Sequence, residues 1–287
     1  MELLLNNISY IYDEGTSYEH AALAGVNLKI SQGEFIGLIG ETGAGKSTLI
    51  RLMNGLIRPT HGGVFVDGQD IGDKDYPIHK LRGRVGMVFQ YPEQQVFEST
   101  VIKDVMFGPS NQGLDEFQVE LRSYEALKAV GIGQDLLDVS PLELSGGQKR
   151  RVAIAGVLAM QPEILILDEP TAGLDAEGRE QIFALMHSLH REKGVTIIFI
   201  SHRMEDVANH ARRVIVMHDG MIRMDGTPEE VFARYKELED MGLRSTTAVY
   251  VAEGLRAKGM QIDKHIVTSD QLIDGMVKGE QIATERR

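Results

Sequence analysis

A glycine-rich segment near residue 40 has the composition of a phosphate-binding loop. It reads Gly-Glu-Thr-Gly-Ala-Gly-Lys-Ser, and it lies between an apolar run at 35–39 and a helical pattern at 46–57. Glycines let the backbone wrap closely around phosphates, so that N–H groups and a helix N-terminus point at negative charge. The lysine would neutralise the β- and γ-phosphates, and the serine hydroxyl would bind Mg²⁺. We therefore expect nucleotide phosphates to contact Gly40, Glu41, Thr42, Gly43, Ala44, Gly45, Lys46, Ser47 and Thr48.

Two adjacent carboxylates, Asp168 and Glu169, follow a second apolar run at 164–167. Ligands of open α/β sheets lie beyond the carboxyl ends of the strands, where both acids would be. Asp168 could bind Mg²⁺, either directly or through a water molecule. Glu169 could polarise the attacking water as general base. An acidic pair after a strand also serves as a helix cap, but the phosphate loop in the same chain favours catalysis.

The rest of the chain alternates strand-like and helical segments. Parallel strands are predicted at 35–39, 164–167, 196–200 and 214–217, and helices at 46–57 and 150–160. This alternation predicts an α/β fold with a parallel sheet. Runs at 3–12, 23–30 and 63–66 predict antiparallel strands, with turns at 67–68 and 219–220. Residues 93–144 are mostly helical in pattern, and Thr227-Pro228-Glu229-Glu230 combines a capping box with proline at the first helical position.

A family resemblance adds to these motifs. Leu144-Ser145-Gly146-Gly147-Gln148 resembles the signature motif of ATP-binding-cassette (ABC) ATPases, and it lies before the acidic pair, as that family requires. Gln90 resembles the Q-loop glutamine, 172–175 the D-loop, His202 the switch histidine and Tyr12 the aromatic that stacks on adenine, with Tyr10 as its competitor. The resemblance implies a P-loop NTPase (RecA-like) parallel-sheet core with an N-terminal antiparallel β subdomain, a helical subdomain and a C-terminal extension.

The same resemblance implies roles for these residues. Gln90 and His202 would assist Glu169 in hydrolysis, and Gln90 would join Ser47 and Asp168 around Mg²⁺. Contacts with ATP are implied for Ser145, Gly146, Gly147, Gln148 and Asp175. Because Ser145 and the glycines precede a helix, they form a second N-terminus suited to anions. One chain already supplies the phosphate loop, so this second site predicts a γ-phosphate bound between two subunits.

Three segments, 88–98, 153–160 and 171–175, resemble energy-coupling-factor (ECF) transporter ATPases, most closely the second of their two paired subunits. This implies a second ATPase subunit, with a heterodimer favoured, a transmembrane coupling protein and a substrate-binding membrane subunit, together importing vitamins, cobalt or nickel. Residues 1–235 would form the ATPase domain, with the helical subdomain at about 93–150, and 236–287 an extension that could dimerise. The coupling protein would dock in a groove lined by Tyr91, Pro92, Val96 and Phe97, with Glu93 and Glu98 as its acidic groups.

Composition narrows the function classes. The net charge of −12 argues against a nucleic-acid partner, although Lys149-Arg150-Arg151 forms a local basic patch. The sequence has no cysteine, which excludes disulfides and thiolate metal sites. No stretch approaches the roughly 20 apolar residues of a membrane span, so we expect a peripheral protein on the cytoplasmic face of the cell membrane. Alternatives are the ATPase of another ABC transporter class, an ABC ATPase acting on DNA or ribosomes, and a non-hydrolysing regulatory cassette, which would require loss of Glu169 or His202.

Overall fold

The computed structural model describes the backbone of residues 1–285 and the side chains of residues 1–277. Its contacts divide the chain into two compact units. The first joins Met1–Glu34 with Ser47–Ile200, and the second joins Phe35–Lys46 with the chain from Ser201 onward. The predicted boundary at residue 235 stays a prediction.

The first unit begins with a four-stranded antiparallel sheet. Its strand order is β2-β1-β4-β5, with bounds Leu3–Tyr12 for β1, His20–Ile30 for β2, His61–Val66 for β4 and Gln69–Asp70 for β5. Alternate residues of β1, such as Leu3 and Leu5, are buried, as expected for a sheet with one face in the core. The turn at Asp67-Gly68 has positive φ at both residues, 49° and 81°, which suits the twist of a two-residue hairpin. The predicted antiparallel strands are thus confirmed.

Three parallel strands form the core of the first unit. They are β6 (Val85–Val88), β7 (Ile164–Asp168) and β8 (Thr196–Ile200), with β7 paired to both neighbours. All of their residues except Asp168 are buried, so these strands read as continuous apolar runs. Helix α6 (Ala176–Lys193) contacts β8, and the Phe183 and Phe199 rings meet edge to face with centroids 5.6 Å apart. The strand β6, in the segment Val85–Val88, was not predicted.

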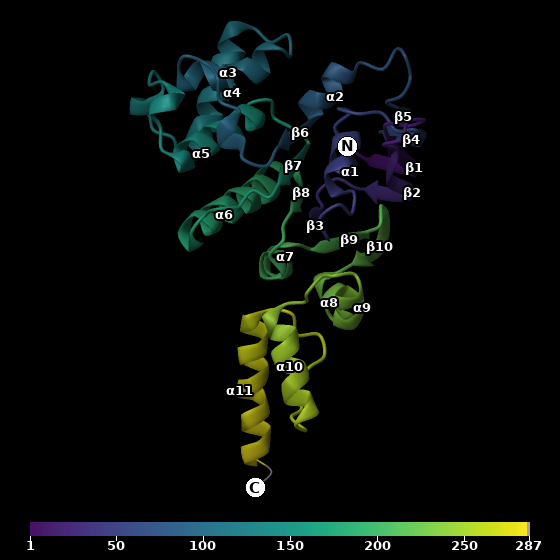
Figure 1. Ribbon diagram of the computed structural model, residues 1–287. Helices are drawn as coiled ribbons and strands as arrows, with labels where there is room; N and C mark the ends of the chain where they lie inside the picture. The colour runs from purple at the N-terminus through teal and green to yellow at the C-terminus, as the bar shows by residue number, and fades with distance from the viewer. Residues whose placement is uncertain (286–287) are drawn as a thin grey trace. The chain divides into compact units, whose positions relative to one another are not determined.

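The other helices of this unit precede β7 in the sequence. They are α1 (Lys46–Met53), which begins at the unit boundary, α2 (Ile78–Arg84), α3 (Val101–Ser110), α4 (Glu116–Ala129) and α5 (Gly146–Leu158). Single 3-10 turns lie at η1 (Pro92–Gln94), η2 (Gln134–Leu136) and η3 (Pro141–Glu143). Helix α3 contacts α4 and α5, and the three gather in one lobe in Figure 1. Helix α1 ends before the predicted residue 57, because Gly55 adopts φ 67° and a side chain there would lie 2.5 Å from Ile78.

In the second unit, β3 (Phe35–Gly40) pairs in parallel with β9 (Arg213–His218), which pairs antiparallel with β10 (Met221–Gly226). The predicted turn at 219–220 joins β9 to β10 with φ of 49° and 69°. At the end of β3, a Cβ on Gly40 would lie 2.4 Å from the Met217 carbonyl oxygen, so only glycine fits where the phosphate-loop segment starts.

The second unit contains five further helices among its described residues, one before β9 and four after β10 in the sequence. They are α7 (Met204–His210), α8 (Pro228–Phe232), α9 (Tyr235–Asp240), α10 (Thr247–Ala257) and α11 (Ser269–Glu285). The predicted capping box of Thr227 and Glu230 is present at α8. Helices α10 and α11 contact each other around a small core of Ala248, Ala252, Ile262 and Ile266 (Figure 1). Residues 286–287 of the predicted extension lie outside the described residues.

Candidate nucleotide-binding and catalytic site

The predicted phosphate loop closes around its own lysine. Lys46 is only 8% exposed, and its Nζ donates hydrogen bonds to the carbonyl oxygens of Gly40 at 2.7 Å and Glu41 at 2.8 Å. Gly43 and Gly45 have φ of 88° and 95°, which side chains rarely tolerate, so the loop needs glycine at both positions. The ammonium group is therefore fixed inside the loop, at the N-terminus of α1, where an anion is favoured.

The two predicted carboxylates lie at the carboxyl end of β7. Asp168 is the last residue of the strand, and the Glu169 backbone N–H donates to the Ile200 carbonyl at 3.1 Å. Glu169 has φ 50°, a left-handed conformation that is uncommon for a residue with a side chain. Gln90 follows β6, the strand paired with β7, and its Nε2 donates a hydrogen bond to Glu169 Oε2 at 3.2 Å. The fold thus brings together two residues that are 79 positions apart and that were both predicted to act in hydrolysis.

The predicted adenine-stacking residue lies beside α1. Tyr12 is the last residue of β1, and its hydroxyl lies 3.2 Å from Thr48 Oγ1. The ring of Tyr10 packs edge to face against Tyr12, with centroids 4.7 Å apart. Both tyrosines are therefore near the helix that follows the phosphate loop, with Tyr12 in direct contact with it.

The signature segment forms the N-terminus of α5. Ser145 Oγ accepts from the Gln148 backbone N–H at 3.3 Å, and Gln148 Oε1 accepts from the Ser145 N–H at 2.9 Å, a reciprocal capping box. A Cβ added to Gly146 or Gly147 would meet no atom within 4 Å. The chain's own packing therefore does not require these glycines.

The D-loop residue Asp175 lies at the N-terminus of α6, and the predicted switch histidine His202 lies just after β8. The Asp175 carboxylate caps α6 by accepting from the Gly178 N–H at 2.8 Å. His202 is exposed and lies in the second unit, two residues after β8 ends. The predicted contacts of His202 and Asp175 with ATP, and of Ser47, Asp168 and Gln90 with Mg²⁺, stay predictions.

Two expectations about the groove after Gln90 are wrong. Pro92 is buried in η1 and does not line an open groove. The Glu93 carboxylate does not face outward either, because it pairs with Arg150, Oε2 to Nε at 3.1 Å and Oε1 to Nη2 at 3.3 Å. Tyr91 and Phe97 are exposed, and their role in lining a docking groove stays a prediction.

The sequence indicates Arg150 only as part of a basic patch, yet the residue is buried, with 6% of its surface exposed. The signal that could have revealed it is helical spacing. Arg150 lies four and eight residues before Ile154 and Leu158, two buried residues of α5, so all three share one face of the helix.

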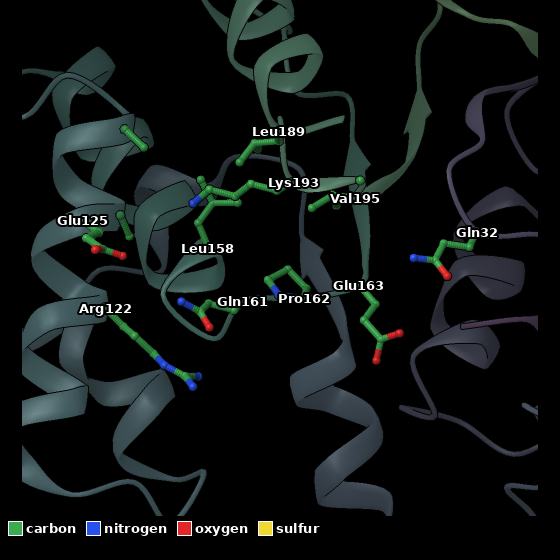
Figure 2. Close-up of a pocket in the computed structure, with 13 residues that line it drawn as sticks. Gln32, Arg122, Glu125, Leu158, Gln161, Pro162, Glu163, Leu189, Lys193 and Val195 are labelled. Carbon is green, nitrogen blue, oxygen red and sulfur yellow. The ribbon is translucent and has the colours of Figure 1, made fainter. Parts of the chain in front are cut away.

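A separate cavity of about 460 Å³ lies at the opposite ends of the strands (Figure 2). Glu163 and Val195, which line it, directly precede β7 and β8, so the cavity is at the amino ends of these strands. Its charged groups are those of Arg122, Glu125, Glu163 and Lys193. Because Asp168 and Glu169 are at the carboxyl end of β7, this cavity is distinct from the candidate site.

Within the described residues, no helix combines the length and the apolar character that a membrane crossing requires.

Comparison with known proteins agrees with the motifs. The family model for ABC transporters matches residues 23–172. The energy-coupling factor transporter ATP-binding protein EcfA2 of Caldanaerobacter subterraneus is 49% identical over 94% of this chain and 95% of its own length. The protein of the same name from Symbiobacterium thermophilum is 51% identical, with 95% of this chain and 94% of that protein covered.

Solved structures show the same fold. The structure of cbiO1 from Clostridium perfringens, described as part of the ABC transporter complex cbiONQ, superposes with a TM-score of 0.72 at 41% identity, covering 83% of this chain and 93% of that one. A dimeric ATP-binding cassette in a post-hydrolysis state, bound to ADP and Pi, gives a TM-score of 0.71 at 31% identity, covering 79% and 98%. The chain is an ABC ATPase with a P-loop NTPase core, and it belongs to the family of energy-coupling factor transporter ATP-binding proteins.

Proposed function

We propose that this ATPase powers uptake by an ECF-type importer, with Glu169 as the general base that activates the attacking water. The observation that carries the role of Glu169 is its position: it follows β7 directly, is held at φ 50°, and its carboxylate contacts Gln90 at 3.2 Å. A carboxylate oriented by a neighbouring amide is suited to accept a proton from water. Lys46 and the loop from Gly40 to Thr48 bind the phosphates, Tyr12 stacks on adenine, and His202 donates to the γ-phosphate.

Mg²⁺ fits the donors that this site offers. Ser47, Asp168 and Gln90 supply a hydroxyl, a carboxylate and an amide oxygen, the hard ligands that this ion prefers. The bound ion would neutralise charge on the phosphates during transfer. Within this chain, Ser47 and Asp168 would hold it, and Gln90 would link it to Glu169.

The signature segment supports a second ATPase subunit. Ser145, Gly146, Gly147 and Gln148 present a helix N-terminus, and a Cβ added to either glycine would come within 4 Å of no other segment among the described residues. Glycine there is explained if a nucleotide held by another subunit approaches the backbone. We infer a dimer with ATP between the phosphate loop of one subunit and the signature of the other, and the resemblance to one member of a pair favours a heterodimer.

An aromatic surface near Gln90 supports docking of a transmembrane coupling protein. Phe97 and Phe107 meet edge to face with centroids 5.1 Å apart, yet they are 64% and 52% exposed, and Tyr91 is 48% exposed. Apolar groups this exposed are typical of interaction sites. Glu98 is left as the acidic group for a basic partner. We infer that the chain is a peripheral subunit on the cytoplasmic face of the membrane, below a coupling protein and a separate substrate-binding subunit that selects vitamins, cobalt or nickel.

The C-terminal extension supports dimerisation in the same way. Helices α10 and α11 bury one small core between them, and Val251, Ile273 and Val277 remain 41%, 59% and 52% exposed. Exposed aliphatic side chains on a two-helix element are suited to packing against a second copy or a paired subunit.

The deciding experiment is the Glu169→Gln variant. The amide cannot accept the proton from water, so hydrolysis should fall by about 10²–10⁴-fold while ATP binding persists. The variant should then accumulate as an ATP-bound dimer on a sizing column. Near wild-type turnover would remove Glu169 from the proposed role. Purification of the wild-type chain with its membrane partners tests the transporter class, since an ECF importer should yield a coupling protein and a substrate-binding subunit.

A further inference from the structure

Arg150 is a buried arginine whose guanidinium group contacts two separate segments of the first unit. It lies in α5, two residues after the signature segment, and is 6% exposed. Two of its nitrogens bind the Glu93 carboxylate, at 3.1 and 3.3 Å. Its Nη1 donates to the Ala172 carbonyl at 2.7 Å and to the Pro170 carbonyl at 3.4 Å. A buried charge with this many partners is fully engaged in holding the surrounding chain.

The segments that Arg150 joins are those that carry the catalytic pair. Glu93 lies in η1, three residues after Gln90, and the carbonyls of Pro170 and Ala172 belong to the turn directly after Glu169. The Ala172 N–H donates to the Glu169 carbonyl at 3.1 Å, which closes that turn. Gln90 and Glu169 meet at 3.2 Å, so the two segments are connected once through the catalytic side chains and a second time through Arg150.

Both connected segments contain a disfavoured backbone conformation. Tyr91, directly after Gln90, has φ 56°, and Glu169 has φ 50°. Residues with side chains rarely adopt this region, and they keep it only where surrounding contacts hold them there. The contacts of Arg150 lie within three residues of each strained position.

The ionisation of Glu93 agrees with this arrangement. Burial opposes the charged form of its carboxyl, but hydrogen bonds from Arg150 and from the backbone outweigh burial, so the pKa of Glu93 lies below its usual range. The Glu93 carboxylate is therefore charged at neutral pH.

We propose that Arg150 is a positioning residue for ATP hydrolysis, which holds Gln90 and Glu169 in register by binding Glu93 on one side and the turn after Glu169 on the other. The inference rests on the proposed role of Glu169 as general base. Arginine is needed because its planar fork can bind a carboxylate with two nitrogens and still donate to carbonyls with the third. Lysine offers one nitrogen and cannot reproduce that geometry.

The test is the Arg150→Lys variant, which keeps the charge. Displacement of a catalytic group by about 1 Å can cost about 10²-fold in rate, so kcat should fall by about 10- to 100-fold while KM for ATP changes by less than about threefold. Glu93→Gln keeps the carbonyl contacts of Arg150 and should cause a smaller fall in kcat. Rates are measured by single-turnover hydrolysis of labelled ATP, so that slow variants remain measurable.

The matched control is Arg84→Met. Arg84 also bridges two carboxylates of the first unit, Glu163 and Asp67, but it contacts neither segment of the catalytic pair. The Arg84→Met variant should have a lower melting temperature than the wild type but an unchanged kcat. A purely structural role for Arg150 would give the same pattern.

A second comparison separates positioning from general damage. When Arg150→Lys is added to the Glu169→Gln variant, the hydrolysis rate should not fall further, because the carboxylate that Arg150 would position is already absent. A soluble, ATP-binding Arg150→Lys or Glu93→Gln variant with wild-type kcat, or an equal loss from Arg150→Lys in both backgrounds, would overturn the inference and leave the proposed base intact. Wild-type turnover by Glu169→Gln alone would overturn both.

Discussion

The left-handed backbone at Glu169 predicts that glycine there is more stable than alanine, the reverse of the usual order. Glu169 has φ 50°, and it is held by its own N–H bond to Ile200 and by the turn to Ala172. Both substitutions remove the carboxylate and its contact with Gln90. The difference in stability between the glycine and alanine variants therefore reports the cost of the backbone conformation alone. Both variants should lose hydrolysis.

The size of the difference follows from two opposing terms. A residue with a Cβ is destabilised in the left-handed region by about 1–2 kcal/mol. Glycine loses more backbone entropy on folding, which costs about 0.5–1 kcal/mol relative to alanine. We therefore expect Glu169→Gly to exceed Glu169→Ala in stability by about 0.5–1 kcal/mol.

Glu180 provides the matched control, since it is exposed in the middle of α6 with ordinary helical geometry. There Glu180→Ala should be more stable than Glu180→Gly by about 1 kcal/mol. Melting temperatures of the four variants, taken without nucleotide, should differ by about 2 °C within each pair and in opposite directions. Alanine equal to or more stable than glycine at position 169 would refute the strain at Glu169.

Two further predictions concern charged groups away from the catalytic pair. Arg84 holds the pKa of both Glu163 and Asp67 below their usual range through side-chain hydrogen bonds. Arg84→Met should therefore lower the free energy of unfolding by about 1 kcal/mol at pH 7, after allowance for solvent screening. This difference from wild type should vanish as pH falls below the depressed pKa values of the two carboxyls. The measurement is urea unfolding across pH 3–7, and a difference that stays constant over this range would contradict the prediction. Glu98→Lys should leave solution ATPase activity unchanged while weakening capture of the coupling protein, because the exposed aromatic surface beside Glu98 would then carry the same charge as a basic partner. Full assembly of Glu98→Lys in a pull-down would show that the docking charge lies elsewhere.

Much of the candidate site could be predicted from short stretches of sequence. The phosphate loop, the acidic pair at 168–169, the signature at 144–148 and the capping box at Thr227 were each read from fewer than ten residues. Each depends on local physics: glycine conformations, a helix N-terminus, or a side chain that bonds to a backbone group three residues away. Local interactions of this kind survive in the folded chain, and the structure places every one of these elements where the sequence predicted it.

The partners of charged side chains could not be predicted in the same way. Glu93 read as an acid facing a membrane partner and Arg150 as part of a surface patch, yet the two are 57 residues apart in sequence and meet in the interior. Whether a charged group is solvated or buried depends on what the fold places opposite it, since burial is tolerated only where a partner satisfies the charge. Sequence alone thus predicted which residues of this protein bind phosphate and activate water. Only the tertiary structure decided that a buried arginine contacts the segments that carry Gln90 and Glu169, because that arrangement arises from long-range packing of α5 against η1 and the turn after β7.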